Sequence, residues 1–163
     1  MCELESQIGM NEKDTCPISI NTRIALVSDI NKIVELERQA FSNPWSEISV
    51  LSWITAGNGA FLIAENAQGI LGYIGYHIAF DIAEIDRFAV ADSVRRCGIG
   101  TGLMNHFMQM IKQENIGRIY LEVRESNEAA LHLYEMTGFI KVGLRKGYYT
   151  DTGEAAILME CQI

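Results

Sequence analysis

Residues Arg95 to Gly100 have the sequence RRCGIG and lie between a strand-like run, Glu84 to Val90, and a helix-like run, Thr101 to Gln113. The two glycines allow a sharp turn without Cβ clashes, so consecutive backbone N–H groups can point at one anion. The helix that follows adds the positive end of its dipole at the same point. The segment predicts a phosphate-binding turn. The glycine pair alone is a weak signal, because many strand-to-helix loops carry glycine.

The residues around this turn exclude two common phosphate sites. The segment lacks the Lys-Ser/Thr pair with which a nucleoside triphosphate loop reaches the terminal phosphates and magnesium. It also lacks the G-x-G-x-x-G spacing, and no acidic residue ends a following strand where a dinucleotide ribose would need one. The remaining interpretation is a pyrophosphate site for another cofactor.

Arg95, Gly98 and Gly100 match the Arg/Gln-x-x-Gly-x-Gly/Ala signature, and the chain thereby resembles the GNAT superfamily of acyl-CoA-dependent N-acetyltransferases. Three other segments are similar to the RimI-type protein N-terminal acetyltransferases of that superfamily: FSNPWS at 41–46, LEVRESNEAALHLYEMTGF at 121–139 and GYY at 147–149. The resemblance covers roughly Arg23 to Ile163. Several independent motifs in the expected order make it far more specific than one glycine turn.

The resemblance implies acetyl-CoA as acetyl donor and assigns residues to it. The end of the strand would expose backbone groups to the pantetheine arm, at Phe88, Ala89 and Val90. The phosphates would meet the backbone amides of Arg96, Cys97, Gly98, Ile99, Gly100 and Thr101. Arg95 and Arg96 would add positive charge or be merely exposed, and Asn127 would donate to the cofactor or cap a helix. Cys97 at a helix N-terminus could be a nucleophile, but filling a variable position of the cofactor turn is the stronger interpretation.

Acetyl transfer from a thioester to an amine needs a neutral amine, a polarised carbonyl and a proton for the departing thiolate. Glu122 lies in an apolar strand, where alternation places it with Arg124 on one face and Leu121 and Val123 on the other. Alone, such a residue would be a surface glutamate paired with Arg124 or solvated. The resemblance implies that Glu122 is the general base, acting through ordered water. It likewise implies that Tyr134 is the acid, and a core tyrosine is the alternative.

The substrate predicted from this resemblance is a protein N-terminus. An α-amino group has a pKa of about 8 against about 10.4 for lysine, so its neutralisation at pH 7 costs roughly 3 kcal/mol less. The implied target is the N-terminal alanine of a small-subunit ribosomal protein, held in a groove walled by Pro44, Trp45, Tyr148 and Tyr149. Trp45 could equally be a core anchor. The loop 150–153 lacks the proline often found there, which leaves the peptide preference open.

Two other functions stay open at this point. The first is a GNAT enzyme that acetylates lysine or a small amine. The second is a non-catalytic regulatory module that binds CoA, in which Glu122 is only structural.

The composition of the chain limits the kinds of molecule that it can be expected to bind. The chain has 163 residues, 48% of them hydrophobic, and a net charge of −8, which suits basic peptides and argues against a nucleic-acid surface. No apolar stretch reaches the roughly 18 to 20 residues of a membrane span, and the acidic N-terminus is unlike a secretory signal, so we expect a cytoplasmic protein. The four cysteines and three histidines show no metal-site or disulfide spacing, so no metal is expected.

The pattern of elements predicts one domain, residues 22–163, after a flexible extension, residues 1–21. Strands are expected at 23–27, 60–65, 70–80, 84–90, 118–124, 140–145 and 155–161, and helices at 30–40, 46–55, 101–113 and from a Ser126 cap to about 137. The fold class is therefore α/β, with a GNAT fold: a mixed, mostly antiparallel central sheet, a parallel βαβ unit for acetyl-CoA and helices on both faces.

Overall fold

The computed structural model describes residues 19–57 and 59–163. Most of the predicted extension therefore lies outside the described residues, and Asn21 begins the first strand. The elements, in chain order, are β1 (Asn21–Ile24), η1 (Val27–Asp29), α1 (Ile30–Ala40), α2 (Glu47–Thr55), β2 (Gly59–Asn66), β3 (Gly69–Ala79), β4 (Ile82–Val90), η2 (Asp92–Val94), α3 (Ile99–Gln113), β5 (Arg118–Arg124), α4 (Glu128–Met136), β6 (Ile140–Tyr149) and β7 (Glu154–Gln162).

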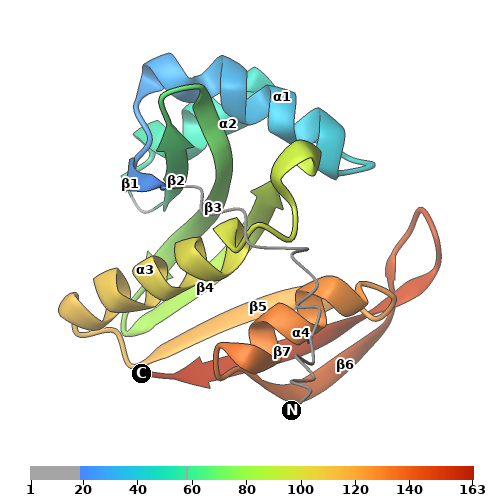
Figure 1. The fold of residues 1–163 in the computed structure, drawn as a ribbon. Coiled ribbons are helices and arrows are strands. Elements are labelled where there is room, and N and C mark those ends of the chain that lie inside the picture. The colour runs from blue at the N-terminus through green and yellow to red at the C-terminus, as the bar shows by residue number, and fades with distance from the viewer. Residues whose placement is uncertain (1–18, 58) are drawn as a thin grey trace, which may run out of the picture.

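The strands form one seven-stranded sheet in the order β1-β2-β3-β4-β5-β7-β6 (Figure 1). Neighbours are antiparallel except β4 and β5, which are parallel and joined through α3. A parallel pair requires such a crossover, because the chain must return to the same end of the sheet. The predicted mixed sheet with one parallel βαβ unit is confirmed.

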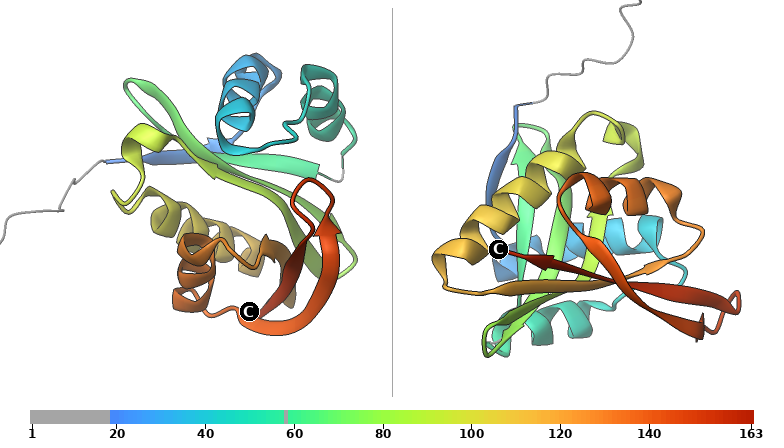
Figure 2. Two further views of the ribbon diagram at one scale, coloured as in Figure 1. Left: turned by 90° about the vertical axis from the view of Figure 1, so that its right-hand side faces the viewer. Right: turned by 90° about the horizontal axis from the view of Figure 1, so that it is seen from below.

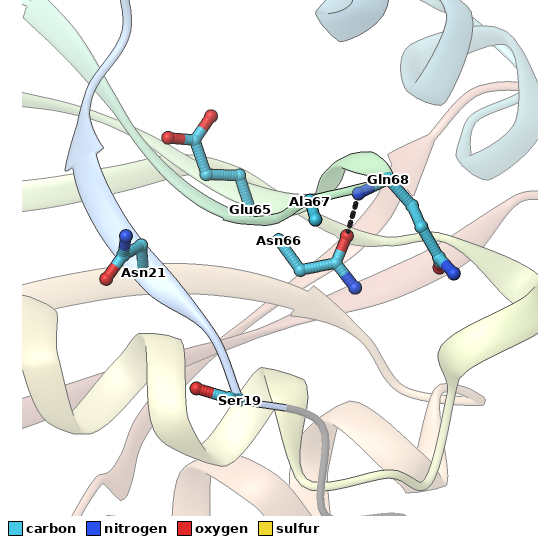
Figure 3. A pocket seen from close by; sticks show the side chains of 6 residues that line it. All are labelled: Ser19, Asn21, Glu65, Asn66, Ala67 and Gln68. Atoms are coloured by element: carbon cyan, nitrogen blue, oxygen red, sulfur yellow. Dashed lines mark hydrogen bonds between the residues drawn. The ribbon is translucent and has the colours of Figure 1, made fainter.

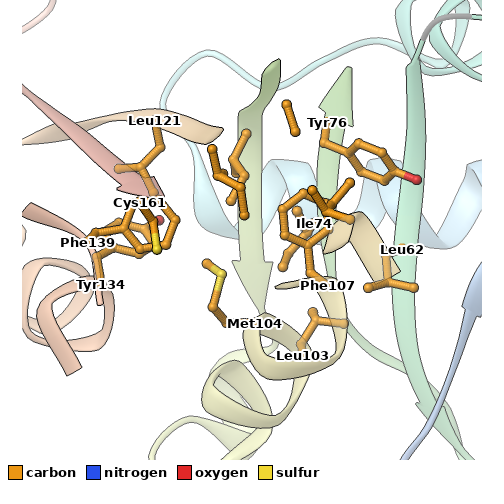
Figure 4. Close-up of a cluster of buried hydrophobic side chains, with 14 of the residues drawn as sticks. Leu62, Ile74, Tyr76, Leu103, Met104, Phe107, Leu121, Tyr134, Phe139 and Cys161 are labelled. Carbon is orange, nitrogen blue, oxygen red and sulfur yellow. The ribbon is translucent and has the colours of Figure 1, made fainter. Parts of the chain in front are cut away.

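Helices cover both faces of this sheet, as predicted. Figure 2 shows α1 and α2 on one side and α3 and α4 on the other. Beneath α3 and α4 lies a large apolar cluster that includes Leu103, Met104 and Phe107 of α3, all fully buried (Figure 4). A second cluster lies beneath α1 and α2 and includes Ile33, Val50 and Phe61. Each face of the sheet therefore has its own apolar cluster beneath its own pair of helices.

Strands β4 and β5 pair over only part of their length. Their register runs from Ile82 opposite Arg118 to Ile85 opposite Leu121. Directly afterwards β4 shifts register against β3 at Asp86, a β-bulge that bends a strand and reverses its alternation. Figure 1 shows the two strands separating beyond this point. We call the resulting gap the wedge, bounded by residues 86–90 of β4 and 122–124 of β5.

Three predicted boundaries at or just before the N-terminal ends of helices are wrong. The helix expected over 101–113 begins two residues earlier, at Ile99. The first strand ends at Ile24 rather than Val27, because residues 27–29 form a 3₁₀ turn in which the Asp29 carboxylate accepts from the N–H of Leu26 at 2.7 Å. The cap of α4 is Asn127 rather than Ser126, and its side-chain oxygen accepts from the N–H of Ala130 at 3.2 Å. A Ser/Thr/Asn/Asp pair before a helix leaves the choice of cap to the backbone path.

The C-terminal hairpin also differs from the prediction. Strand β6 extends to Tyr149, so Tyr148 and Tyr149 belong to a strand and not to the polar loop expected over 146–154. The loop that remains is short. Tyr149 pairs with Glu154 of β7, which itself pairs with β5, and Tyr148 precedes it on the same strand.

Candidate functional site

The turn before α3 has the geometry of an anion site. Gly98, the N-cap of α3, has a left-handed φ of 78°, a conformation that glycine adopts without strain. The first helical hydrogen bond runs from the N–H of Gly102 to the carbonyl of Gly98 at 2.9 Å. The N–H groups of Ile99, Gly100 and Thr101 precede it and, as in the first turn of any α-helix, have no acceptor within the helix. These donors and the helix dipole favour a phosphate group at this point.

This turn lies against the end of β4. A Cβ atom placed on Gly100 would lie 3.5 Å from a methyl of Leu133, 3.7 Å from the Phe88 ring and 3.8 Å from a methyl of Val90. Phe88 and Val90 pack on the α3/α4 side, whereas Ala89 is buried in the cluster on the other face. The turn before α3 and the wedge therefore form one continuous region, which fits a cofactor with a pyrophosphate and an extended arm.

The other residues predicted for the cofactor are placed as follows. Arg95 and Arg96 are exposed, and Arg95 pairs with Asp92 at 2.8 Å. Cys97 is half-buried against the main core, and its N–H donates to Val94 at 3.4 Å. Asn127 caps α4, as described above. The structure thus shows the capping alternative for Asn127, and its contact with a cofactor stays a prediction.

Glu122 lies at the wedge, one residue beyond the last β4–β5 pair. Leu121 and Val123 are buried in the α3/α4 cluster, so Glu122 faces the opposite side of the sheet, as alternation predicts. Its carboxylate accepts from Nη1 of Arg145 on β6 at 2.6 Å, and the Glu122 side chain is 21% exposed. The partner expected in the structural alternative was Arg124, which instead binds Asp151 at 2.7 Å and Glu154 at 3.1 Å.

Tyr134 is buried on α4, on the other side of the wedge from Glu122. Its ring packs 6.2 Å from Phe88 and 5.7 Å from Phe139, measured between ring centres. Burial, assisted by the negative charge that Tyr149 would carry on ionisation, raises the pKa of the Tyr134 phenol. The phenol therefore keeps its proton well above neutral pH. A group that donates a proton during the reaction must be protonated in this way.

The paired tyrosines of β6 border the same region. A hydrogen bond to Glu122 is the main cause that raises the pKa of Tyr148, followed by burial. Burial raises the pKa of Tyr149, and the charges of Arg124 and Glu122 act on it in opposite directions. The Arg124 guanidinium stacks 3.9 Å from the Tyr149 ring centre. Glu122 and the two tyrosines therefore form one interacting group beside the wedge.

Pro44 and Trp45 lie on the segment between α1 and α2, residues 41–46. Pro44 is exposed, while the half-buried Trp45 ring packs 4.8 Å from Trp53, which supports the core-anchor alternative for its ring. The Ser42 hydroxyl donates to the Asp151 carboxylate at 2.6 Å. This contact joins the segment to the β6–β7 hairpin, so the predicted groove walls stand on one side of the sheet.

Sequence reasoning missed a buried polar network beside these walls. Glu37 of α1 is fully buried and accepts from the Tyr73 hydroxyl and from the N–H of Trp45, the latter at 2.8 Å. The guanidinium of Arg87 approaches the same carboxylate, with Nε 3.8 Å from Oε1. The available signal was a glutamate on the apolar face of a helix, since Ile33, Val34 and Glu37 share that face.

A polar depression of about 570 Å³ lies elsewhere, between β1 and the β2–β3 turn (Figure 3). It is lined by Ser19, Asn21, Glu65, Asn66, Ala67 and Gln68, none of which belongs to the region around the wedge. The described part of the chain contains no cluster of three or more His, Cys, Asp or Glu placed to hold a metal ion. Within the same residues, no helix is long and apolar enough to cross a membrane.

Comparison with known proteins identifies the family. The profile of the family described as acetyltransferase (GNAT) family matches residues 30–139. The chain belongs to this family. Its members use acetyl-CoA, and the open N–H groups of α3 together with the wedge fit that molecule. The protein is therefore an acetyl-CoA-dependent N-acetyltransferase.

Individual relatives are similar over most of their length. A Bacillus subtilis protein, provisionally named as a ribosomal protein bS18-alanine N-acetyltransferase, is 34% identical over 134 residues, covering 82% of this chain and 89% of that protein. The Escherichia coli K12 ribosomal protein bS18-alanine N-acetyltransferase is 30% identical over 138 residues, covering 83% and 93%. The crystal structure of the Escherichia coli ribosomal-protein-S18-alanine N-acetyltransferase superposes with a TM-score of 0.83, at 27% identity, over 89% of this chain and 94% of that one. The resemblance to RimI-type enzymes and the predicted GNAT fold are confirmed.

Proposed function

We propose that the protein transfers the acetyl group of acetyl-CoA to the N-terminal α-amino group of a protein, by direct attack within a ternary complex. The observation that carries the proposal is the placement of Glu122 and Tyr134 on the two sides of the wedge at which β4 and β5 separate. One side offers a carboxylate, and the other offers a phenol that retains its proton. A base for the amine and an acid for the thiolate meet two of the three requirements of amide formation from a thioester.

Glu122 would accept the proton that the α-ammonium must lose. Arg145 holds its carboxylate in place through a contact of 2.6 Å without burying it completely, since the side chain stays 21% exposed. A residue that remains open to water can exchange a proton with an amine through one ordered water, as the resemblance implies.

Tyr134 would supply the proton for the departing thiolate. As the amine nitrogen forms its bond to the acetyl carbon, the carbon–sulfur bond breaks and the sulfur takes a proton from the phenol. Burial of Tyr134 against Phe88 and Phe139 keeps that proton available, because it disfavours the charged phenolate.

The relatives support an N-terminal alanine of a small-subunit ribosomal protein as the target, since those named above are bS18-alanine N-acetyltransferases. The net charge of −8 suits a basic peptide of this kind, and such a substrate would place the enzyme in the cytoplasm. Pro44, Trp45, Tyr148 and Tyr149 would form the walls that hold the peptide, and the turn over 95–101 would hold the donor.

A peptide-library assay tests the proposal directly. Purified protein is incubated with acetyl-CoA and peptides that carry free N-termini, and mass spectrometry locates the product. We expect acetylation of the α-amine, with alanine preferred at the first position. Product on a lysine ε-amine would favour the other kind of GNAT substrate. Tight cofactor binding without turnover on any amine would instead support a regulatory module.

A further inference from the structure

Arg87 lies on the α1/α2 side of the wedge because of the bulge at Asp86. Regular alternation from Ile85, which is buried under α3, would place residue 87 on the α3/α4 face. The extra residue in β4 turns Arg87 to the other face, towards α1 and α2 and on the same side of the sheet as Glu122. Its side chain is 21% exposed, so a bound peptide can reach it.

An aromatic slot, formed by Phe41 and Trp45, holds the Arg87 guanidinium. Its central carbon lies 4.6 Å from the Phe41 ring centre and 5.1 Å from that of Trp45. One Nη atom donates to the carbonyl of Asn43 at 3.3 Å. Glu37 helps to hold the aromatic slot in place, because its carboxylate accepts a hydrogen bond from the Trp45 N–H and lies 3.8 Å from Nε of Arg87. The guanidinium is therefore rigidly placed and already charge-compensated.

The same guanidinium has donors to spare. An arginine carries five N–H groups. Within residues 19–57 and 59–163, the Asn43 carbonyl is the one hydrogen-bond acceptor of this side chain, and the buried Nε has none. By contrast, Arg124 and Arg145 donate to carboxylates at 3.1 Å or less. The charge of Arg87 also acts on Tyr149, as that of Glu122 does. Among the described residues, Arg87 is thus a cation of this region with unused donors and with no carboxylate at hydrogen-bond distance.

We propose that Arg87 binds the main-chain carbonyl oxygen of the substrate's first residue and thereby selects α-amines over lysine ε-amines. In a peptide N-terminus, that carbonyl oxygen lies about 3 Å from the amine nitrogen, because a single carbon separates the two groups. A lysine ε-amine is followed by a flexible four-carbon stem and presents no acceptor at this distance. The inference rests on the proposed α-amine activity and gives it a physical basis.

The test uses a peptide pair that differs in one atom. The first peptide carries a normal first amide, and the second carries a thioamide there, whose sulfur is a much weaker acceptor. We expect the wild-type protein to lose about 10-fold or more in kcat/KM on the thioamide peptide, as expected for a charge-assisted hydrogen bond. An Arg87→Met variant should lose about as much on the normal peptide, and little more on the thioamide. Its KM for acetyl-CoA should not change.

Controls separate binding from folding. Arg38→Gln removes one positive charge from the exposed side of α1 and should behave as wild type in both assays. Arg87→Met leaves Glu37 buried without its cation, so thermal melting is measured first, and the double variant Glu37→Gln/Arg87→Met removes both charges if the single variant melts early. The thioamide comparison on the wild-type protein needs no variant.

The outcomes are distinct. Equal rates on the two peptides by the wild-type protein would overturn the role of Arg87, and so would an equal thioamide effect in wild type and Arg87→Met. A ratio of α-amine to ε-amine acetylation that falls in the variant supports the proposal. Absence of acetylation on every α-amine peptide would overturn the proposed function, and this inference with it.

Discussion

Replacement of Glu122 by glutamine separates the proposed chemistry from the structural role of the same side chain. Glutamine keeps the size of the side chain and a carbonyl oxygen for Arg145, but it cannot take a proton. If Glu122 is the base, kcat for a free-N-terminus peptide should fall by about 10² to 10⁴, the usual contribution of general-base catalysis. The affinity for acetyl-CoA should stay unchanged, because Glu122 lies on the opposite face of β5 from the α3/α4 cluster.

The stability of this variant should barely change. The ion pair joins a Glu122 side chain that is 21% exposed to an Arg145 side chain that is 55% exposed. Solvent screens such a pair, so its contribution is at most about 1 kcal/mol. For a domain of this size, that corresponds to a decrease in Tm of about 2–4 °C. A large loss of turnover with a small change in Tm is therefore the expected signature.

Arg145→Gln is the matched control, because it breaks the same ion pair and leaves the carboxylate intact. CoA release is followed with a thiol reagent over a range of peptide concentrations, and Tm is measured for both variants. We expect the Arg145→Gln variant to keep at least about a tenth of the wild-type kcat, which corresponds to a loss of no more than about 1.4 kcal/mol in transition-state stabilisation. If both variants lose turnover equally, the ion pair and not the base accounts for the effect. If Glu122→Gln keeps nearly full turnover, the assignment is refuted.

Three further predictions follow from the geometry. Tyr134→Phe preserves the ring packing, so kcat should fall by about 10² or more while Tm stays unchanged. Because burial raises the pKa of Tyr134, the phenol keeps its proton as the pH rises. A wild-type kcat that declines between about pH 7 and 9 because this proton is lost would contradict the assignment. Gly98→Ala meets no atom within 4 Å but must adopt a φ of 78°, so urea unfolding should show a loss of about 1–2 kcal/mol, larger than that of Gly100→Ala, whose Cβ makes only ordinary contacts. Glu37→Ala leaves the Tyr73 hydroxyl and the Trp45 N–H without their acceptor and Arg87 without its counter-ion, so unfolding in urea should reveal a loss of about 3–5 kcal/mol. A loss below about 1 kcal/mol would show that water replaces the carboxylate.

The order of elements and the glycine turn before α3 could be predicted from the sequence because their signals are local. Glycines at 98 and 100 follow a strand and precede an amphipathic helix, and every residue of that pattern lies within one short segment. The alternation around Glu122 is similarly local, and it places this residue on the correct face of β5. Periodicity and turn chemistry are sufficient for features of this kind.

The partners of Glu122 and Glu37 could not be predicted in the same way. Arg124 is the basic residue nearest to Glu122 on its own strand, but Asp151 and Glu154 occupy it, and Arg145 reaches Glu122 only through the register of β6 on β7. Glu37 meets Arg87 because the bulge at Asp86 reverses the alternation of β4. Sequence patterns do not specify where a strand gains an extra residue.

The separation of β4 from β5 has a consequence for the stability of the molecule. Within the described residues, four residue pairs join β4 to β5, beside one further backbone hydrogen bond from the N–H of Gly117 to the carbonyl of Asp81 at 3.0 Å. An acyl donor bound in the wedge would add contacts between β4 and β5, so the bound donor would also stabilise the junction between the β1–β4 and the β5–β7 portions of the sheet. Thermal denaturation should consequently shift upward with ligand concentration, and amide protons at 86–90 and 122–124 should exchange with deuterium more slowly once the complex forms.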